Sequence, residues 1–322
     1  MKKVFARNLL AAAVLGLMNL SVAHAADIPT LLAEGRVDDA ITSLQGKLSS
    51  TPNDAEAYNL LCRAYFALGN WDSGIPSCEK SVKLAPNVSR YHLWLGRIYG
   101  EKADRASWFT AAGLAGKVRS EFEAAVKLNP SSAEARTDLA EFYLEAPGIM
   151  GGGRDKAEEQ AKALDAIDPD RAHWVRGRIA EKNKDLTTAE KEYRASIDAS
   201  HGSALSWLNL ALFYRNHNRL DEMEDAIRHA SDVQSGHAEV LVDAAETLRR
   251  TGRNIPAAID LLRRYLASPT VEAAPAFKAH YLLGMLLEKQ GEKQQAAQEY
   301  RSALTLAKSY SAAQDALNRL NR

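Results

Sequence analysis

The residues that suggest chemistry first are those of a glycine-rich run between Gly148 and Gly153. Its glycine spacing is that of a phosphate-binding loop, but the lysine and the Ser or Thr that bind phosphate and magnesium in such loops are missing. Arg154 and Asp155 follow instead, and the Asp155 carboxylate would repel a phosphate. We therefore interpret the run as a turn in which glycine permits unusual backbone angles.

The histidines and serines do not form a catalytic or metal-binding pattern. His24 lies in the N-terminal segment, and the other seven histidines are scattered, without H-E-x-x-H or an i, i+4 pair beside a carboxylate. No serine lies in G-x-S-x-G, and neither cysteine has the surroundings of a thiol-protease nucleophile. The sequence predicts no catalytic residue, no metal site, no cofactor and no enzymatic activity.

The two cysteines, Cys62 and Cys78, fall on the two helices of one predicted hairpin and face its shared interior. In an oxidising compartment a disulfide would close a loop of about 15 residues and stabilise the protein by up to ~3 kcal/mol. Helical phase places the cysteines roughly one turn out of direct opposition, and disulfide geometry is strict. A disulfide and two reduced, buried thiols therefore both stay open.

A pattern that recurs along the chain predicts the helices that carry these residues. Large, small and aromatic side chains stand at i, i+3, i+4 and i+7, which is one face of an α-helix. The pattern begins at Tyr58 and recurs 34 residues later at His92. Later copies begin at Arg136, Trp207, Leu241 and His280. A second helix follows each first one, and because a single hairpin cannot bury its apolar face, the hairpins are expected to stack.

This spacing resembles the tetratricopeptide repeat, whose pattern is W-x2-L-G-x2-Y, then A-x3-F, then P. The resemblance covers residues 27 to 308 and implies an all-α solenoid, a right-handed superhelix of helical hairpins. We assign residues 26–308 to the array, with about seven full repeats and a shortened first one. The polar segment 309–322 is interpreted as the C-terminal capping helix that such arrays need for solubility.

The N-terminus has the features of a secretory signal peptide. Lys2, Lys3 and Arg7 precede an apolar run, and Ala23-His24-Ala25 provides an A-x-A cleavage site, so residues 1–25 are expected to be removed. The apolar run is too short to span a bilayer, and no cysteine stands near the cut to receive lipid. A short signal of this kind is typical of bacteria, and we predict a periplasmic or secreted protein without stable membrane insertion.

The charge balance points away from nucleic acid as a partner. The chain has 41 basic and 41 acidic side chains, whereas nucleic-acid-binding domains are usually strongly basic. Two insertions interrupt the array, at 103–112 and at 146–153. The first contains Trp108-Phe109, and we expect this pair to pack back onto the nearest helix rather than to form an exposed docking patch.

The resemblance implies that the first helices of the repeats line a concave surface that holds an extended peptide or a partner helix. From the repeat phase, twelve residues are predicted to face that groove: Asn59, Arg63, Phe66, Trp94, Arg97, Thr137, Asp138, Glu141, Trp174, Arg178, Asn209 and Arg215. Arg63 and Arg97 beside Trp94 are expected to hold a carboxylate while an apolar group stacks on the indole. The lysine–asparagine clamp of some relatives is not reproduced here.

These observations predict a non-catalytic periplasmic scaffold or adaptor that binds a protein or peptide partner in a cell-envelope process. Two alternatives stay open. One is a small-molecule, metal-binding or enzymatic site formed by the insertions at 103–112 and 146–153. The other is a structural protein that self-associates through an exposed Trp108-Phe109.

Overall fold

The computed structural model describes residues 27–233 and 237–320, so the predicted signal peptide lies outside the described residues. Helices account for all of the regular structure in this part of the chain, which confirms the expected all-α solenoid. They form successive hairpins: α1 (Ile28–Ala33) with α2 (Val37–Ser50), α3 (Ala55–Leu68) with α4 (Trp71–Leu84), α5 (Ser89–Asp104) with α6 (Trp108–Leu128), α7 (Ala133–Glu145) with α8 (Arg154–Leu164), α9 (Pro169–Lys182) with α10 (Leu186–Ala199), α11 (Ala204–Asn216) with α12 (Leu220–Asp232), α13 (Glu239–Thr251) with α14 (Ile255–Leu266), and α15 (Ala276–Lys289) with α16 (Lys293–Leu306). A last helix, α17 (Ser311–Leu320), follows them.

Local sequence explains where a typical hairpin begins and turns. Asp54 precedes α3 and its side chain accepts a hydrogen bond from the backbone N–H of Ala57 at 2.9 Å, which satisfies one of the free donors at the helix start. Gly69 ends the same helix with a φ of +71°, a conformation that favours glycine. In the next hairpin a Cβ on Gly96 would lie 2.5 Å from Phe122. The small residue therefore lets α5 and α6 approach, as the repeat pattern indicates.

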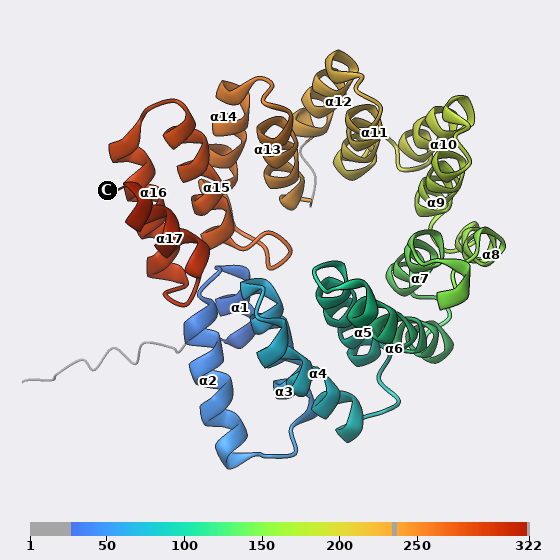
Figure 1. The fold of residues 1–322 in the computed structure, drawn as a ribbon, viewed down its shortest axis with the longest axis horizontal. Coiled ribbons are helices and arrows are strands. Elements are labelled where there is room, and N and C mark those ends of the chain that lie inside the picture. The colour runs from blue at the N-terminus through green and yellow to red at the C-terminus, as the bar shows by residue number, and fades with distance from the viewer. Residues whose placement is uncertain (1–26, 234–236, 321–322) are drawn as a thin grey trace, which may run out of the picture.

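The curvature of the array follows from which helices touch. Successive first helices contact one another, as in the pairs α3–α5, α7–α9, α9–α11, α11–α13 and α13–α15. These helices form the inner wall, and the second helices lie outside them (Figure 1). Tyrosines of the inner wall also tie neighbouring hairpins together: Tyr143 donates to Glu123 at 2.9 Å and Tyr214 donates to Glu190 at 2.8 Å.

The two ends of the array meet, which the repeat pattern did not predict. Figure 1 shows α1 and α2 beside α15, α16 and α17. One apolar cluster contains Leu31, Leu32 and Leu44 from the first hairpin together with Phe277 from α15 and Ala313 from α17. All five side chains are buried. The hydrophobic core is therefore continuous across the junction of the two ends, which we call the seam.

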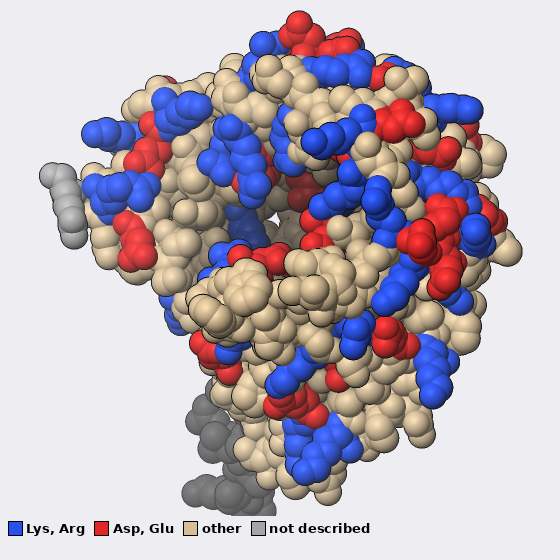
Figure 2. Space-filling view, turned by 45° about the vertical axis from the view of Figure 1, so that its right-hand side comes forward, with Lys and Arg blue, Asp and Glu red and all other residues tan. Residues whose placement is uncertain are grey.

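Polar contacts add to the seam. The hydroxyl of Thr270 donates to the backbone carbonyl of Ala33 at 2.8 Å, and the backbone N–H of Ser309 donates to Asp38 at 3.1 Å. Gly35, between α1 and α2, approaches so closely that a Cβ there would lie 2.8 Å from the backbone nitrogen of Ala276. The solenoid is therefore a closed ring, and Figure 2 shows the opening through its centre, surrounded by charged side chains.

Most of the first insertion is helical, and residues 105–107 link its two helical parts. It completes α5 and begins α6, which has 21 residues. Trp108 and Phe109 are 61% and 83% exposed, and their ring centroids lie 5.3 Å apart. The expectation that they pack onto a neighbouring helix is wrong, because they stand in the first turn of α6, well before Ala115, its first buried residue.

The second insertion is a turn, as interpreted from its glycines. It contains a short 3-10 helix, Gly148–Met150, which contacts α6, and Gly151 follows with a φ of +93°. The side chain of Ile149 is 88% exposed. The insertion therefore packs against the outer helix of the preceding hairpin and presents one apolar side chain to solvent.

Candidate partner-binding surface

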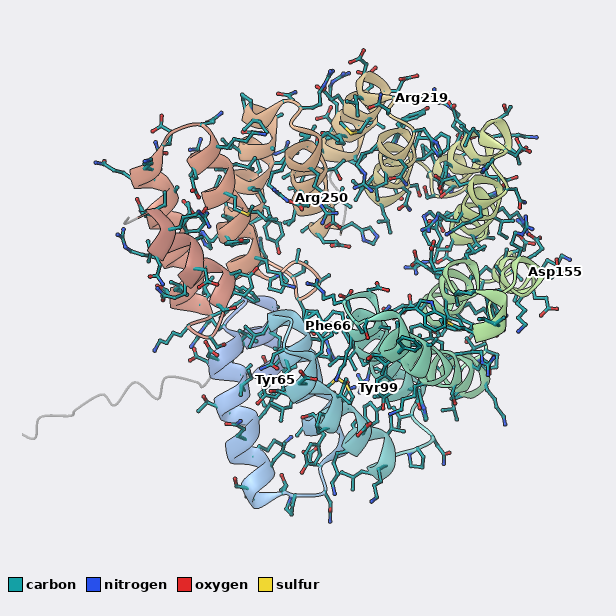
Figure 3. The ribbon with its side chains drawn as sticks, viewed as in Figure 1. Tyr65, Phe66, Tyr99, Asp155, Arg219 and Arg250 are labelled. Atoms are coloured by element: carbon teal, nitrogen blue, oxygen red, sulfur yellow. A yellow bond between two sulfur atoms is a disulfide. The ribbon has the colours of Figure 1, made fainter. Side chains whose placement is uncertain are left out.

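The inner wall presents most of the residues that the repeat phase assigned to a groove. Eleven of the twelve are partly exposed, on α3, α5, α7, α9 and α11. Figure 3 shows Phe66 and Arg250 directed toward the central opening, whereas Asp155 and Arg219 lie on the outer side of the ring. Thr137 uses its hydroxyl locally, donating to the backbone carbonyl of Ala133 at 2.8 Å.

Asn59 departs from the prediction. Its side chain is fully buried in α3, and neither atom of its amide has a hydrogen-bond partner among the described residues. Its helical phase is that of the groove residue Arg63, one turn later, but the residues at the same repeat position in three other hairpins, Leu93, Leu208 and Val242, are buried as well, so this position belongs to the packed interior. Asn59 is therefore not part of an open binding surface in this structure.

Arg63, Trp94 and Arg97 form a cluster at the N-terminal part of the inner wall. The guanidinium carbons of Arg63 and Arg97 lie 5.2 and 5.1 Å from the centroid of the Trp94 indole. Phe66 meets the same indole edge-on, with ring centroids 5.3 Å apart. Cation–π and aromatic contacts of this kind hold planar side chains in one orientation.

Both arginines already hold carboxylates of the chain itself. Arg63 forms a bidentate ion pair with Glu272, in which Nε donates to Oε1 at 2.8 Å. Arg97 contacts Asp138 at 2.6 Å and Glu134 at 2.7 Å. In this structure the carboxylates that the two arginines hold belong to the chain itself, and their binding of a partner's carboxylate stays a prediction.

The partner of Arg63 was not found from the sequence, although a signal for it exists. Glu272 lies in the segment 267–275 between α14 and α15, and the same segment carries Thr270 to the seam. The copies of the repeat pattern that begin at Leu241 and His280 are 39 residues apart instead of 34. That spacing indicates a third insertion, and the structure places it across the seam.

The pKa values of charged side chains on the inner wall depend on their burial as well as on their ion pairs. Burial alone would lower the pKa of Arg97, but the carboxylates of Asp138 and Glu134 outweigh it and raise that pKa. Burial raises the pKa of Asp138, and Glu134 and Glu141 add to the shift while Arg97 opposes it. Farther along the wall, desolvation by surrounding protein and the negative charges of Glu239 and Glu246 raise the pKa of Asp243 to about 6, although its side chain still reaches solvent.

A second ionic cluster joins α7 to α9. Arg178 stacks on Trp174 at 5.4 Å and contacts Glu141 at 2.9 Å and Glu145 at 2.7 Å. Lys182 reaches the same Glu145 at 2.6 Å. These side chains lie on consecutive inner helices, so the predicted residues of this region are brought together.

The predicted residues on α11 lie farther along the wall. Arg215 donates to Asn216 at 3.0 Å, and burial with the nearby Arg250 lowers the pKa of Arg215. Asn209 makes no hydrogen bond through its side chain within the described part of the chain and is partly exposed. Within the described residues, neither of them contacts the arginine cluster of α3 and α5. The twelve predicted residues therefore form a line along the wall instead of one compact site.

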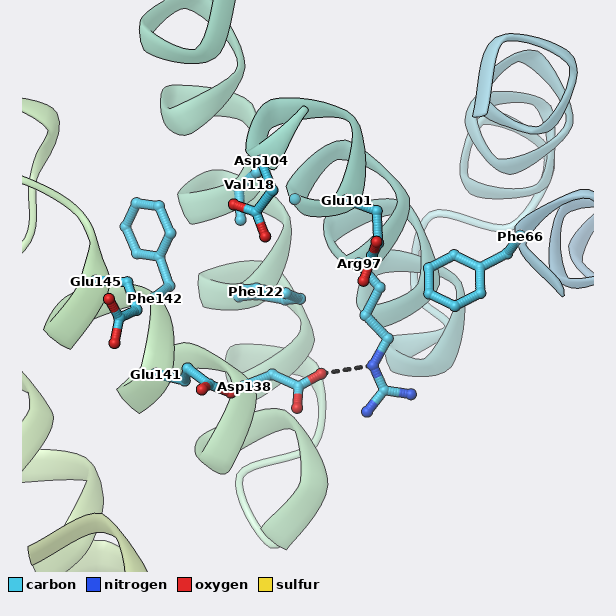
Figure 4. Close-up of a pocket in the computed structure, with 11 residues that line it drawn as sticks. Phe66, Arg97, Glu101, Asp104, Val118, Phe122, Asp138, Glu141, Phe142 and Glu145 are labelled. Carbon is cyan, nitrogen blue, oxygen red and sulfur yellow. Dashed lines mark hydrogen bonds and ion pairs between the residues drawn. The ribbon is translucent and has the colours of Figure 1, made fainter. Parts of the chain in front are cut away.

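A cavity of about 380 Å³ opens on the inner wall between α3, α5, α6 and α7 (Figure 4). Its lining combines aromatic and aliphatic side chains with acidic ones: Phe66, Arg97, Gly100, Glu101, Asp104, Val118, Phe122, Asp138, Glu141, Phe142 and Glu145. A second cavity, of about 280 Å³, shares Phe66 and Arg97 with it and extends toward Glu272 and Lys278. The two cavities therefore adjoin at Phe66 and Arg97, and together we call them the hollow beside the arginine cluster.

The structure pairs Cys62 with Cys78 on α3 and α4, with their Cα atoms 5.2 Å apart. This separation lies within the range of disulfides. Gly74 helps α4 to approach α3, because a Cβ there would lie only 3.1 Å from the Cβ of Tyr65. The geometry is compatible with the disulfide alternative, and the oxidation state in the cell stays a prediction.

The described residues contain neither a metal-ion site nor a membrane-spanning helix. No group of three or more His, Cys, Asp or Glu side chains is arranged to hold a metal ion within residues 27–233 and 237–320. None of the helices in the same residues has both the length and the apolar character of a membrane span.

Comparison with known proteins identifies the repeat. Tetratricopeptide repeat models match residues 31–98, 151–204 and 242–316. Among solved structures, yeast Tom70 is similar with a TM-score of 0.54 at 14% identity, over 88% of this chain and 58% of that one. The structure titled APC/C hetero-tetramer Cut9-Hcn1 has a TM-score of 0.41 at 16% identity, and this chain covers 54% of it while 92% of this chain is matched. A thermophilic protein of the same repeat class from Thermus thermophilus has a TM-score of 0.46 at 21% identity, over 69% of this chain and 95% of that one.

No curated protein matches the sequence. At these identities the likeness to solved structures concerns the fold alone.

Proposed function

The chain belongs to the tetratricopeptide repeat superfamily, and on this premise we propose that it is a non-catalytic scaffold that binds a protein or peptide partner along its inner wall. Repeats of this family generally mediate protein–protein interaction. The observation that carries the proposal is the hollow on α3, α5 and α7, where aromatic and charged side chains lie half-exposed on consecutive first helices.

The physical basis is the combination of pre-organised side chains with accessible apolar surface. Trp94, Phe66 and Arg97 are held by one another and by Asp138, so little side-chain freedom is left to lose on binding. Phe66 and Phe142 supply apolar area beside polar groups that fix orientation. Such a wall recognises a partner by contact and needs no reactive group.

We further propose that the protein works in the periplasm, in a cell-envelope process. The support is the sequence of residues 1–25, which has the charge, apolar run and cleavage site of a secretory signal. A disulfide between Cys62 and Cys78 would fit an oxidising compartment. The measurement is N-terminal sequencing of the protein from the periplasmic fraction of its host, with Ala26 expected as the first residue.

The test of scaffold function is affinity purification from the native host with quantitative mass spectrometry. Glu141→Lys reverses a charge on the inner wall. Lys191→Glu reverses a charge at an exposed position of the outer helix α10 and serves as the matched control. The proposal expects a partner that is retained by the wild type and by Lys191→Glu and is depleted by Glu141→Lys. Equal recovery with all three proteins would contradict binding at the inner wall.

Self-association is a second candidate function, because Trp108 and Phe109 expose adjacent aromatic rings at the start of α6. Exposed apolar pairs favour contacts between molecules. Sedimentation velocity over a range of concentrations would show a concentration-dependent species that Trp108→Ser with Phe109→Ser abolishes. A single monomeric species at every concentration would remove this candidate.

A further inference from the structure

We propose that the cavity between α3, α5, α6 and α7 is a docking site for a cationic side chain, Lys or Arg, that stands next to an apolar residue in a partner peptide. This inference rests on the proposed function and specifies the chemistry of its partner. The observations behind it are an apolar floor and an acidic rim (Figure 4), one unpaired carboxylate on that rim, and open space beside Gly100.

The floor of the cavity is apolar and fixed. Val118 and Phe122 of α6 are 4% and 6% exposed, so their side chains are packed in the core and present only a small surface to the cavity. Phe66 of α3 and Phe142 of α7 are partly exposed on its two sides. An apolar side chain of a partner would gain by covering these rings.

The rim is acidic. Five carboxylates line the cavity, and Arg97 is the basic side chain among its lining residues. Arg97 is itself neutralised by Asp138 and Glu134. The cavity therefore attracts positive charge and disfavours a partner's carboxylate.

Two of the rim carboxylates are available to a partner. Asp104 is exposed and makes no ion pair or hydrogen bond through its side chain within the described residues. Glu101, one turn earlier on the same face of α5, forms only a long, solvent-exposed ion pair with Arg105 at 4.0 Å, with the two side chains 43% and 72% exposed. Lys278 lies near Glu101 from α15 but is placed in the adjoining cavity. The other rim carboxylates are already paired: Glu141 and Glu145 both bind Arg178.

The dimensions select a side chain instead of a whole domain. A cavity of about 380 Å³ accommodates one long side chain together with a neighbouring apolar group. The aliphatic stem of Lys or Arg would lie over Phe122 while its charged end meets Glu101 and Asp104. A peptide that offers this pair in an extended conformation would follow the inner wall toward Phe66.

Gly100 provides a sharp test. It lines the cavity, and a Cβ added there would meet no atom within 4 Å, so a larger side chain would enter the open space. Gly100→Leu is expected to fold, because leucine is a better helix former than glycine and its Cβ would meet no atom within 4 Å. Gly116 of α6 is the matched control, since its Cβ would also meet no atom within 4 Å and it does not line the cavity.

The experiment selects binders from a library of short randomised peptides with the purified mature protein. The same selection is run on Gly100→Leu, on Gly116→Leu and on Glu101→Gln with Asp104→Asn. One selected peptide is then synthesised with its basic residue intact, with that residue replaced by norleucine, and with it replaced by glutamate. Fluorescence anisotropy measures the affinity of each version.

We expect the selected peptides to be enriched in Lys or Arg beside an apolar residue. Their affinity should fall by about tenfold or more for Gly100→Leu and for the double variant Glu101→Gln with Asp104→Asn. Gly116→Leu should bind as the wild type does, and norleucine should weaken the peptide by a similar factor. Peptides that bind at the cavity without a preference for basic residues would overturn this inference and leave the proposed function intact. Peptides unaffected by Gly100→Leu would overturn it as well, by placing the binding elsewhere, and no selection at all would count against both.

Discussion

The ion pair between Arg63 and Glu272 is predicted to help hold the ring closed, and its removal tests whether the ring is a unit. The perturbation is Arg63→Met, which keeps most of the side-chain length beside Trp94, and Glu272→Gln, which removes the charge. These residues are 209 positions apart in sequence, so their coupling reports on the seam.

The expected size follows from the geometry. Two hydrogen bonds join the guanidinium to the carboxylate, and the side chains are 19% and 21% exposed. Hydrogen bonds to charged groups contribute about 1.5–3 kcal/mol when they are shielded from water. We take the lower end, about 1.5 kcal/mol, because solvent still reaches both side chains. That free energy corresponds to a factor of about ten in the population of open rings.

The assay is hydrogen exchange followed by mass spectrometry. Peptides from α1 and α2, at the seam, should exchange about ten times faster in either single variant, and peptides from α9 and α10, on the far side of the ring, should not change. The double variant should be no worse than either single one, because both remove the same interaction. Arg228→Met is the control: its pair with Asp225 is 64% exposed on both sides and should have no measurable effect. Additive effects, or the same acceleration in α9 and α10, would refute closure through this pair.

Three further predictions concern single features of the fold. Asn59→Leu should raise the free energy of unfolding by about 1–2 kcal/mol in urea titrations, because it removes a buried amide without partners among the described residues. A loss of stability would show instead that the amide is hydrogen-bonded in solution. Alkylation and mass spectrometry should find Cys62 and Cys78 blocked until a reductant is added; replacing both with alanine should cost up to ~3 kcal/mol, and full labelling without reductant would exclude the bond. His92 donates a hydrogen bond through its ring nitrogen to the Glu121 carboxylate, which raises the pKa of His92 above its usual value while burial opposes the shift. This pair should therefore stabilise the protein below about pH 6.5 and lose that effect as the pH rises through the folded-state pKa. Urea titrations from acidic to alkaline pH should show that His92→Gln flattens this dependence, and an unchanged profile would contradict it.

The hairpins could be predicted from sequence because each depends on residues that are close together in the chain. The face of α3, the turn at Gly69 and the approach at Gly96 are all determined by local spacing, and family models and structure agree with that expectation. The phase also placed Phe66, Trp94 and Arg97 on one wall. Stacking of similar hairpins leaves little freedom in which faces turn inward.

The closure could not be predicted in the same way, because it depends on the sum of small rotations over all of the hairpins. Local pattern does not determine whether the last hairpin meets the first, stands above it or falls short of it. The occupation of Arg63 by Glu272 is a consequence of closure and was missed with it. The exposure of Trp108 and Phe109 was missed for another reason, since an insertion that extends a helix has no neighbouring helix to cover its first turns.

Photo-crosslinking in the native host tests the central claim, that a partner binds inside the ring, most directly. A photoreactive residue is placed at Gly100 on the inner wall and, in a second protein, at Lys191 on the outer helix α10, and the crosslinked partner and site are identified by mass spectrometry. Binding at the inner wall predicts one defined partner, captured from Gly100 and absent from Lys191. The same products from both positions, or capture from Lys191 alone, would contradict it.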